Sequence, residues 1–335
     1  MILIDATFVN SKGGINVFRR ILESIHPSER YKFVLFVDKR LSGNYSFFHD
    51  FKFYNTNGFF NRLFQYQQIK NQVKIIFSLG NVPLLFAKGS YQITYNMQLL
   101  LFDRKKVSFI NKIKWSFKSM IVRLLFLYTD SDVAVQTNKI KNLISRKYSI
   151  SRSKIFEFPV FYETRKTTVP VKLSSFFCPS SGEKYKNVEF IIDVFAEYTR
   201  VHKNSKLYLT ISNKYKKIID KIKYFNLENI VNLGEISHDE VMNLIKDNYI
   251  IIHPSSVESF GLVLLESAYS ENIIIAPNLD YVNDVCKPSI LYEENNKLDL
   301  LNKLNNLKLE NLNRSKPKIQ NQSDELIKYL ISKLD

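Results

Sequence analysis

Short runs of apolar and β-branched residues alternate along this chain with longer segments in which apolar residues recur every three or four positions. The first pattern predicts buried strands, and the second predicts amphipathic helices. Their alternation is typical of a parallel sheet with helices on both faces. In the first half we predict strands at 2–6, 33–37, 75–78, 92–95, 133–136 and 155–158, and helices at 15–25, 107–128 and 138–148.

The alternation breaks after Pro159 and resumes at Phe176. The residues between, 163–175, have no apolar period and predict a linker. Beyond it we predict strands at 176–178, 206–211, 230–233, 249–252 and 273–276, and helices at 188–202, 216–225, 238–247 and 261–269. Ser237 and Glu240 have the spacing of a capping box at the start of one of these helices.

These elements predict two doubly wound α/β domains, at 1–162 and 176–315, followed by a helical segment at 316–335 that packs against either domain. The length of 335 residues fits two such domains. We expect a central cleft between the carboxyl ends of the two sheets, because open α/β sheets bind ligands there.

The composition excludes several classes of protein. An apolar content of 45% excludes a mostly disordered chain. Two cysteines, Cys178 and Cys286, cannot form a disulfide framework, which favours a reduced, cytosolic protein. No apolar run approaches the roughly 18–20 residues of a membrane span. The first residues have the pattern of a strand and not of a signal peptide.

The net charge of +16 calls for an anionic partner, which could be a nucleic acid, a membrane surface or a phosphorylated substrate. General drift of the composition toward lysine is the alternative explanation. Residues 101–160 hold 13 Lys and Arg but only four acidic residues. Since the chain has no zinc-finger spacing and no aromatic RNA-binding run, we do not expect nucleic acid as a partner.

The segment 107–128 within this basic region has an apolar stripe at helical spacing. The stripe consists of Ile110, Ile113, Phe117, Met120, Ile121, Leu124 and Tyr128. Lys112, Lys114 and Lys118 lie between these residues, and Trp115 lies outside the stripe. The pattern suits a helix in a membrane interface. The alternative, which the pattern alone favours, is a core-facing helix with a solvated basic face.

The stretch from His253 to Glu266 carries the clearest chemistry. It follows a predicted buried strand directly and leads into a helix near Gly261. Amides of Phe260, Gly261 and Leu262 would then lie at the positive end of a helix dipole, an arrangement that binds phosphate. Gly261 would let an anion approach the backbone, because it has no Cβ.

Two glutamates flank this helix start. Glu266 lies five residues beyond Gly261, about 7.5 Å along a helix axis, which matches the reach from a diphosphate to the ribose of the same nucleotide. Glu258 precedes the helix and would lie beside the phosphates. As alternatives, Glu258 could cap the helix and Glu266 could be a solvated helix residue.

Glu258 and Glu266, with Phe260-Gly261 between them and His253-Pro254-Ser255 before them, resemble the paired-glutamate signature of family 4 retaining glycosyltransferases. That resemblance implies the GT-B fold of two Rossmann-like domains. Further segments with the family's pattern follow in order at Gly13-Gly14, 77–81, 135–138, 179–187 and 233–234. Many members of the branch that looks most similar build O-antigen or capsular polysaccharide in bacteria.

The resemblance implies roles for individual residues. Lys186 neutralises the departing pyrophosphate, Glu258 orients the transferring sugar and Glu266 holds the ribose. The family usually carries an Arg upstream of this Lys, but 180–182 here read Ser-Ser-Gly. Lys184 is the candidate substitute, although an ammonium is not a bidentate guanidinium, and a plain solvated lysine is the alternative.

The first domain contributes further candidates. Gly13 and Gly14 would bring the backbone close to donor phosphate or acceptor, and a tight strand-to-helix turn is the alternative reading. Asn96 stands where many relatives carry a His near the donor sugar. It cannot act as a general base but can bond a sugar hydroxyl. The histidines at 26, 49, 202 and 238 are predicted to be surface residues.

The resemblance thus predicts a retaining transfer from a nucleoside-diphosphate sugar to a lipid-linked glycan acceptor, in bacterial surface polysaccharide synthesis. We expect no metal and no further cofactor, since Lys and helix dipole supply the positive charge. A peripheral position on the cytoplasmic face of the membrane would follow, with Lys112, Lys114, Trp115 and Lys118 at the lipid. The alternatives are a sugar-nucleotide epimerase of the same fold and an inactive scaffold subunit.

Overall fold

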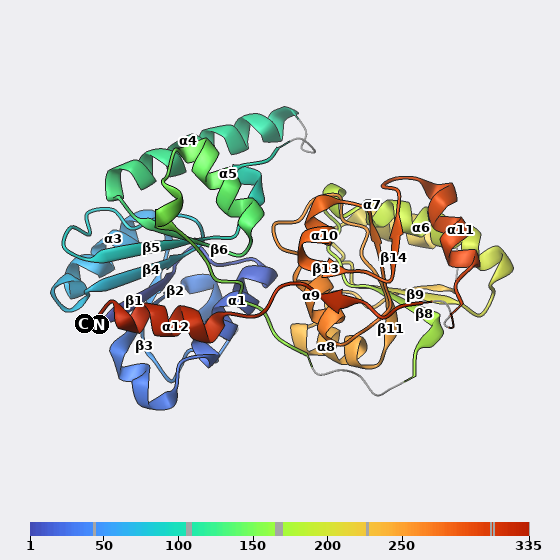
Figure 1. The fold of residues 1–335 in the computed structure, drawn as a ribbon, viewed down its shortest axis with the longest axis horizontal. Coiled ribbons are helices and arrows are strands. Elements are labelled where there is room, and N and C mark those ends of the chain that lie inside the picture. Colours follow the sequence, from blue (N-terminus) through green and yellow to red (C-terminus); the bar gives the residue numbers. More distant parts are fainter. Residues whose placement is uncertain are drawn as a thin grey trace. The chain divides into compact units, whose positions relative to one another are not determined.

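The computed structural model describes residues 1–42, 45–104, 109–164, 170–225, 228–308, 310 and 312–334. The chain forms two compact units (Figure 1). Unit 1 consists of Met1–Phe161 and Asn321–Asp335, and unit 2 consists of Tyr162–Gln320.

Unit 1 is built on a seven-stranded parallel sheet with the order β3-β2-β1-β4-β5-β6-β7 (Figure 1). Its strands are β1 (Ile2–Ala6), β2 (Phe33–Asp38), β3 (Lys52–Thr56), β4 (Ile75–Leu79), β5 (Tyr91–Asn96), β6 (Asp132–Val135) and β7 (Ile155–Glu157). The central strands are buried throughout because helices cover both faces, which explains their continuous apolar runs. The edge strand β3 has no such run and was not predicted.

The helices of unit 1 are α1 (Lys12–Glu23), α2 (Lys39–Ser42), α3 (Gly58–Ile69), α4 (Phe109–Thr129), α5 (Asn138–Tyr148) and α12 (Ser323–Ser332). Helix α12 returns to unit 1 and packs beside α1 (Figure 1). The amide of Gln322, at the start of α12, donates to the carbonyl oxygen of Pro159 at 2.7 Å. The predicted C-terminal helix therefore belongs with the N-terminal domain.

Helix α4 contradicts the alternative of a core-facing apolar stripe. Every member of that stripe is exposed, by 40% at Ile121 and up to 79% at Ile110. The buried residues are instead Ser119, Val122 and Phe126, of which Ser119 and Phe126 contact Tyr148 of α5. The helix therefore packs through these three buried residues and leaves its larger apolar face exposed to solvent. Residues 107 and 108 of the predicted helix lie outside the described residues.

Unit 2 is built on a six-stranded parallel sheet with the order β10-β9-β8-β11-β12-β14. Its strands are β8 (Lys172–Cys178), β9 (Lys206–Leu209), β10 (Ile230–Asn232), β11 (Tyr249–Ile252), β12 (Ile274–Pro277) and β14 (Ile290–Tyr292). A separate antiparallel pair joins β13 (Cys286–Lys287) to β15 (Lys316–Pro317). Strand β8 begins inside the predicted linker at 163–175, of which 165–169 lie outside the described residues.

The helices of unit 2 are α6 (Val188–Val201), α7 (Lys216–Phe225), α8 (His238–Lys246), α9 (Leu262–Tyr269), α10 (Asp280–Val285) and α11 (Lys297–Asn305). The predicted capping box at Ser237 and Glu240 is confirmed at the start of α8. Helices α10 and α11 and strand β14 were not predicted. Among the residues that the structure describes, no helix combines the length and the apolar character needed to cross a membrane.

Candidate functional site

The candidate site lies at the carboxyl edge of the unit 2 sheet. Strands β8 and β11 are neighbours, so the loops that follow them meet at that edge. The amide of Ser256, in the loop after β11, donates to the carbonyl oxygen of Tyr185, in the loop after β8, at 2.8 Å. Parallel pairing of two strands thus joins sequence segments that are about 70 residues apart.

Lys186 and Glu258 form an ion pair across these two loops. The Lys186 Nζ lies 2.6 Å from the Glu258 Oε1, and the two side chains remain 21% and 14% exposed. Burial by itself lowers the pKa of Lys186, but attraction to Glu258 outweighs it and the pKa is raised. Burial raises the pKa of Glu258, but attraction to Lys186 outweighs it and the pKa is lowered. Both groups are therefore charged at neutral pH.

His253 is a buried neighbour of this pair. Its Nε2 lies 3.7 Å from the Glu258 Oε1, and its ring packs at 6.1 Å from the ring of Tyr281. Burial lowers the pKa of His253 to about 4, so the imidazole is neutral at neutral pH. Sequence reasoning used His253 only as part of a motif; its position directly after a buried strand was the signal that it approaches the site.

Glu266 lies in the second turn of α9 and is buried, so the alternative of a solvated helix residue is wrong. Its Oε1 lies 2.8 Å from the Nε2 of His238. The prediction that His238 is a surface residue is also wrong, because its side chain is only 15% exposed. Helices α8 and α9 pack against each other, which brings together two residues that no local sequence pattern connects.

Helix α9 begins after Gly261, which has a φ of 77°. Glycine suits this left-handed position, and an added Cβ would lie 3.2 Å from the Leu264 Cδ1. The N-cap residue of this helix is Gly261, and the Glu258 carboxylate accepts from Lys186. Phe260 is buried and Leu262 is half-buried. The three amides predicted to bind phosphate thus lie at a helix N-terminus whose dipole favours an anion.

The loop before Lys186 holds an arrangement that sequence reasoning missed. The ring of Tyr215 lies against Gly182, and a Cβ on Gly182 would come within 2.3 Å of the Tyr215 Cγ. The hydroxyl of Tyr215 donates to the Oε1 of Glu183. Lys184 is exposed, which agrees with the alternative of a solvated lysine. An aromatic side chain therefore packs on the loop where relatives of the resembled family carry an Arg.

The unit 1 candidates lie at the carboxyl edge of the other sheet. Gly13 and Gly14 are in the first turn of α1, where the Gly14 amide donates to the Oγ of the N-cap Ser11 at 3.2 Å. Asn96 is the last residue of β5 and is 1% exposed. Neither its amide nitrogen nor its amide oxygen has a hydrogen-bond partner among the described residues.

The α4 candidates divide into two groups. Lys112, Lys114 and Lys118 are exposed, whereas Trp115 is half-buried. The Lys118 Nζ lies 4.7 Å from the Trp115 ring centroid, which is cation–π distance. The exposed apolar side chains of α4 are those of the predicted stripe together with Leu127.

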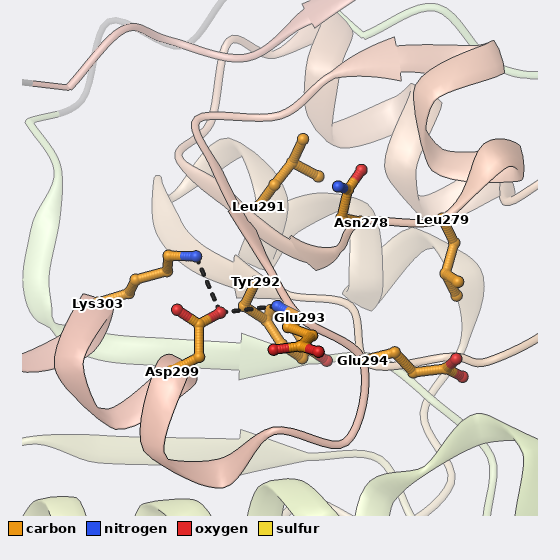
Figure 2. Close-up of a pocket in the computed structure, with 8 residues that line it drawn as sticks. All are labelled: Asn278, Leu279, Leu291, Tyr292, Glu293, Glu294, Asp299 and Lys303. Atoms are coloured by element: carbon orange, nitrogen blue, oxygen red, sulfur yellow. Dashed lines mark hydrogen bonds and ion pairs between the residues drawn. The ribbon is translucent and has the colours of Figure 1, made fainter.

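Unit 2 also contains a pocket of about 600 Å³ at the carboxyl ends of β12 and β14 (Figure 2). It is lined by Asn278, Leu279, Leu291, Tyr292, Glu293, Glu294, Asp299 and Lys303. Figure 2 shows the Asp299 carboxylate accepting from the Lys303 Nζ at 2.9 Å and from the Glu293 amide at 2.7 Å. Within the described residues, no three His, Cys, Asp or Glu side chains are grouped so as to hold a metal ion.

Part of the chain matches a known protein family. Residues 163–324 match the family described as glycosyl transferases group 1. A further match, 29% identical over 104 residues, is to the phosphatidylinositol N-acetylglucosaminyltransferase gpi3 subunit of Schizosaccharomyces pombe. It covers 30% of this chain and only 22% of that relative, so the chain spans about a fifth of the relative's length.

Solved structures with low sequence identity share the fold of the whole chain. Sucrose-phosphate synthase from Thermosynechococcus elongatus matches with a TM-score of 0.72 and 13% identity, over 91% of this chain and 88% of that one. Anabaena HepE in complex with UDP and glucose matches with a TM-score of 0.71 and 12% identity, over 99% and 96%. WaaG, a glycosyltransferase of lipopolysaccharide biosynthesis, matches at 0.68 and 12%, over 91% and 90%.

These findings confirm the predicted fold class, with two parallel-sheet α/β units and GT-B neighbours. Together with the domain match, they support a glycosyltransferase.

Proposed function

We propose that this protein transfers a sugar from a nucleoside-diphosphate sugar to a glycan acceptor, with retention of the anomeric configuration. The observation that carries the proposal is the Lys186–Glu258 pair beside the start of α9 and the buried Glu266. Positive charge, helix amides and a ribose-binding carboxylate are the groups that a sugar nucleotide requires. The fold neighbour HepE supports such a donor, because it was solved with UDP-glucose and with UDP.

Lys186 and the amides at 260–262 hold the diphosphate in this proposal. An incoming diphosphate competes with Glu258 for the Lys186 ammonium, which is still 21% exposed. The ammonium and the helix dipole then stabilise the negative charge that grows on the leaving nucleoside diphosphate. Glu258, released from Lys186, accepts from hydroxyls of the transferring sugar and orients it. The acceptor hydroxyl attacks on the face from which the nucleotide leaves, which gives retention.

Glu266 accepts from the ribose hydroxyls of the donor. Asn96 is the candidate in unit 1 for contact with a sugar hydroxyl, since its buried amide has unused donors and an acceptor among the described residues. Gly13 and Gly14 are candidates for backbone contact with a phosphate or the acceptor. No step of this scheme requires a metal ion.

The acceptor in this proposal is a lipid-linked glycan of bacterial surface polysaccharide synthesis, reached from the cytoplasmic face of the membrane. The support is α4, whose exposed apolar residues and lysines line one helix. An apolar stripe between basic side chains complements a bilayer that has anionic headgroups over an apolar interior. We therefore propose that α4 lies in the headgroup layer of that membrane.

The donor site is tested by thermal unfolding with UDP, GDP, CMP and ADP, in the wild type and in Glu266→Ala. A nucleotide that binds the folded protein raises the melting temperature by mass action. A rise with one nucleotide that disappears in Glu266→Ala supports the donor site and identifies the base. No rise with any nucleotide contradicts the transferase and favours an inactive scaffold. Product analysis separates transfer from epimerisation, which needs no acceptor.

Membrane binding is tested by co-sedimentation with vesicles of phosphatidylglycerol and phosphatidylcholine. Replacement of Lys112, Lys114 and Lys118 by Glu should abolish binding, and salt should weaken it. The matched control replaces Lys216, Lys217 and Lys223, on α7 of unit 2, by Glu. Equal loss in both triple variants, or unchanged binding after the α4 changes, would contradict a role for α4.

A further inference from the structure

His238 is the residue that contacts the carboxylate of Glu266. It is the first residue of α8, and its Nε2 lies 2.8 Å from the Glu266 Oε1. The two side chains are 15% and 2% exposed, so water competes little for this bond. The ring of Tyr162 packs against the His238 ring, with 5.3 Å between the ring centroids. The imidazole is thus confined by an aromatic ring and a carboxylate.

The hydrogen bond has a defined direction. A carboxylate oxygen accepts, so the Nε2 of His238 donates in this bond. The terminal torsion of a free glutamate is broad, and a fixed donor on one oxygen therefore orients the whole carboxylate. The bond from His238 to the Oε1 also fixes the direction of the Oε2, which can accept from a second donor.

The backbone around both residues is held by other contacts. The Thr164 Oγ1 donates to the carbonyl oxygen of Glu266 at 2.6 Å, which anchors α9 independently of His238. The start of α8 is held by the capping box of Ser237 and Glu240, and its buried residues Met242 and Ile245 anchor the helix. Loss of the imidazole should therefore change the orientation of the Glu266 carboxylate more than it changes the fold.

We propose that His238 is a positioning residue that orients Glu266 toward the ribose hydroxyls, and that this pair selects ribonucleoside over 2′-deoxyribonucleoside diphosphates. The inference rests on the proposed function, in which Glu266 binds the donor ribose. It deepens that function, because it assigns selectivity for the ribose of the donor nucleotide to a side chain that touches no substrate.

The test is isothermal titration of UDP and 2′-deoxy-UDP, or of the pair with the base selected by thermal unfolding. The quantity measured is the ratio of the two Kd values. A hydrogen bond to a charged group predicts that the wild type prefers the ribonucleotide by about tenfold or more. In His238→Ala the ratio should fall toward one, and in His238→Gln, whose amide can donate in the same place, it should recover. His202→Ala, a change of a half-buried histidine elsewhere in unit 2, should leave it unchanged.

The ratio is informative because a merely structural role would weaken both ligands alike and leave their ratio unchanged. An unchanged ratio in His238→Ala would overturn the inference. So would tighter UDP binding in that variant, because His238 would then occupy the place of the ribose. If the wild type binds no nucleoside diphosphate, the proposed donor site fails and the inference fails with it. If binding is lost in Glu266→Ala while His238→Ala keeps the wild-type ratio, only the inference fails.

Discussion

Both units carry an ion pair at the carboxyl edge of their sheet, and the two pairs are built differently. In unit 1, Arg62 of α3 pairs with Asp5 of β1, and both side chains are 1% exposed. The guanidinium also donates to the Oγ of Ser78 and to the carbonyl oxygens of Val82 and Pro83. In unit 2, Lys186 and Glu258 pair over 2.6 Å but keep exposed surface.

The difference follows from the chemistry of the two cations. A guanidinium is planar and carries five donors, so protein acceptors alone can satisfy it in a fixed geometry. The Arg62 pair therefore clamps the loop after β4 to β1. An ammonium is compact and its donors rotate, so a partly exposed lysine can exchange a carboxylate for an incoming phosphate. We infer that the first pair serves stability and the second serves ligand binding.

The largest effect is expected from Arg62→Met. This change leaves the Asp5 carboxylate buried without its cation, which should lower the free energy of unfolding by about 3–5 kcal/mol. Urea denaturation measures it. The double variant Arg62→Met with Asp5→Leu should recover part of the loss, because it removes the unpaired charge. A loss below about 1 kcal/mol would show that Arg62 does not act as a clamp.

Lys186→Met should lower the transfer activity strongly and the stability only slightly, the opposite of what is expected for Arg62→Met. We expect the rate of sugar transfer to fall about 100- to 1000-fold, because the leaving diphosphate loses a preorganised positive charge. The melting temperature should change little, since water reaches the Glu258 that remains. Steady-state kinetics and thermal unfolding measure the two quantities on one preparation. A loss of stability as large as that in Arg62→Met would remove the contrast between the two pairs.

A smaller effect is expected from acid, through His253. Its pKa is about 4 in the folded protein and near 6.5 when unfolded, so between these values the unfolded chain binds the proton first. The free energy of unfolding should therefore fall as the pH drops from 6.5 toward 4, by up to about 3 kcal/mol. Urea denaturation at stepped pH measures the slope. His253→Asn should flatten it, whereas the exposed control His26→Asn should not.

The smallest effect is expected from Gly182→Ala. The added methyl would overlap the Tyr215 ring, so the loop that carries Lys186 must shift, at a cost of about 1–3 kcal/mol. The KM for the donor should rise while the fold persists. In a Tyr215→Ala background, which lacks the overlapping ring, the same Gly182→Ala change should cost much less stability. If it costs as much in that background as in the wild type, the predicted clash is not the cause.

Much of the fold follows from local patterns. Strands β1, β2, β4 and β11 were predictable because both of their faces are buried, which requires continuous apolar residues. The capping box of α8 was predictable because it depends on two side chains three residues apart. The polar edge strand β3 was not, because an edge strand buries only part of its side chains.

The candidate site divides in the same way. The sequence by itself determined the loop that begins at His253 and the helix that begins near Gly261, since both depend on neighbours along the chain. Tertiary structure alone decided which face of α4 packs against unit 1. It also decided that Tyr215 covers Gly182 and that His238 bonds Glu266. Hydrophobic periodicity indicates which residues of a helix share a face, but it does not indicate which face packs against the core. Contacts between residues far apart in the chain depend on helix packing, which no local spacing records.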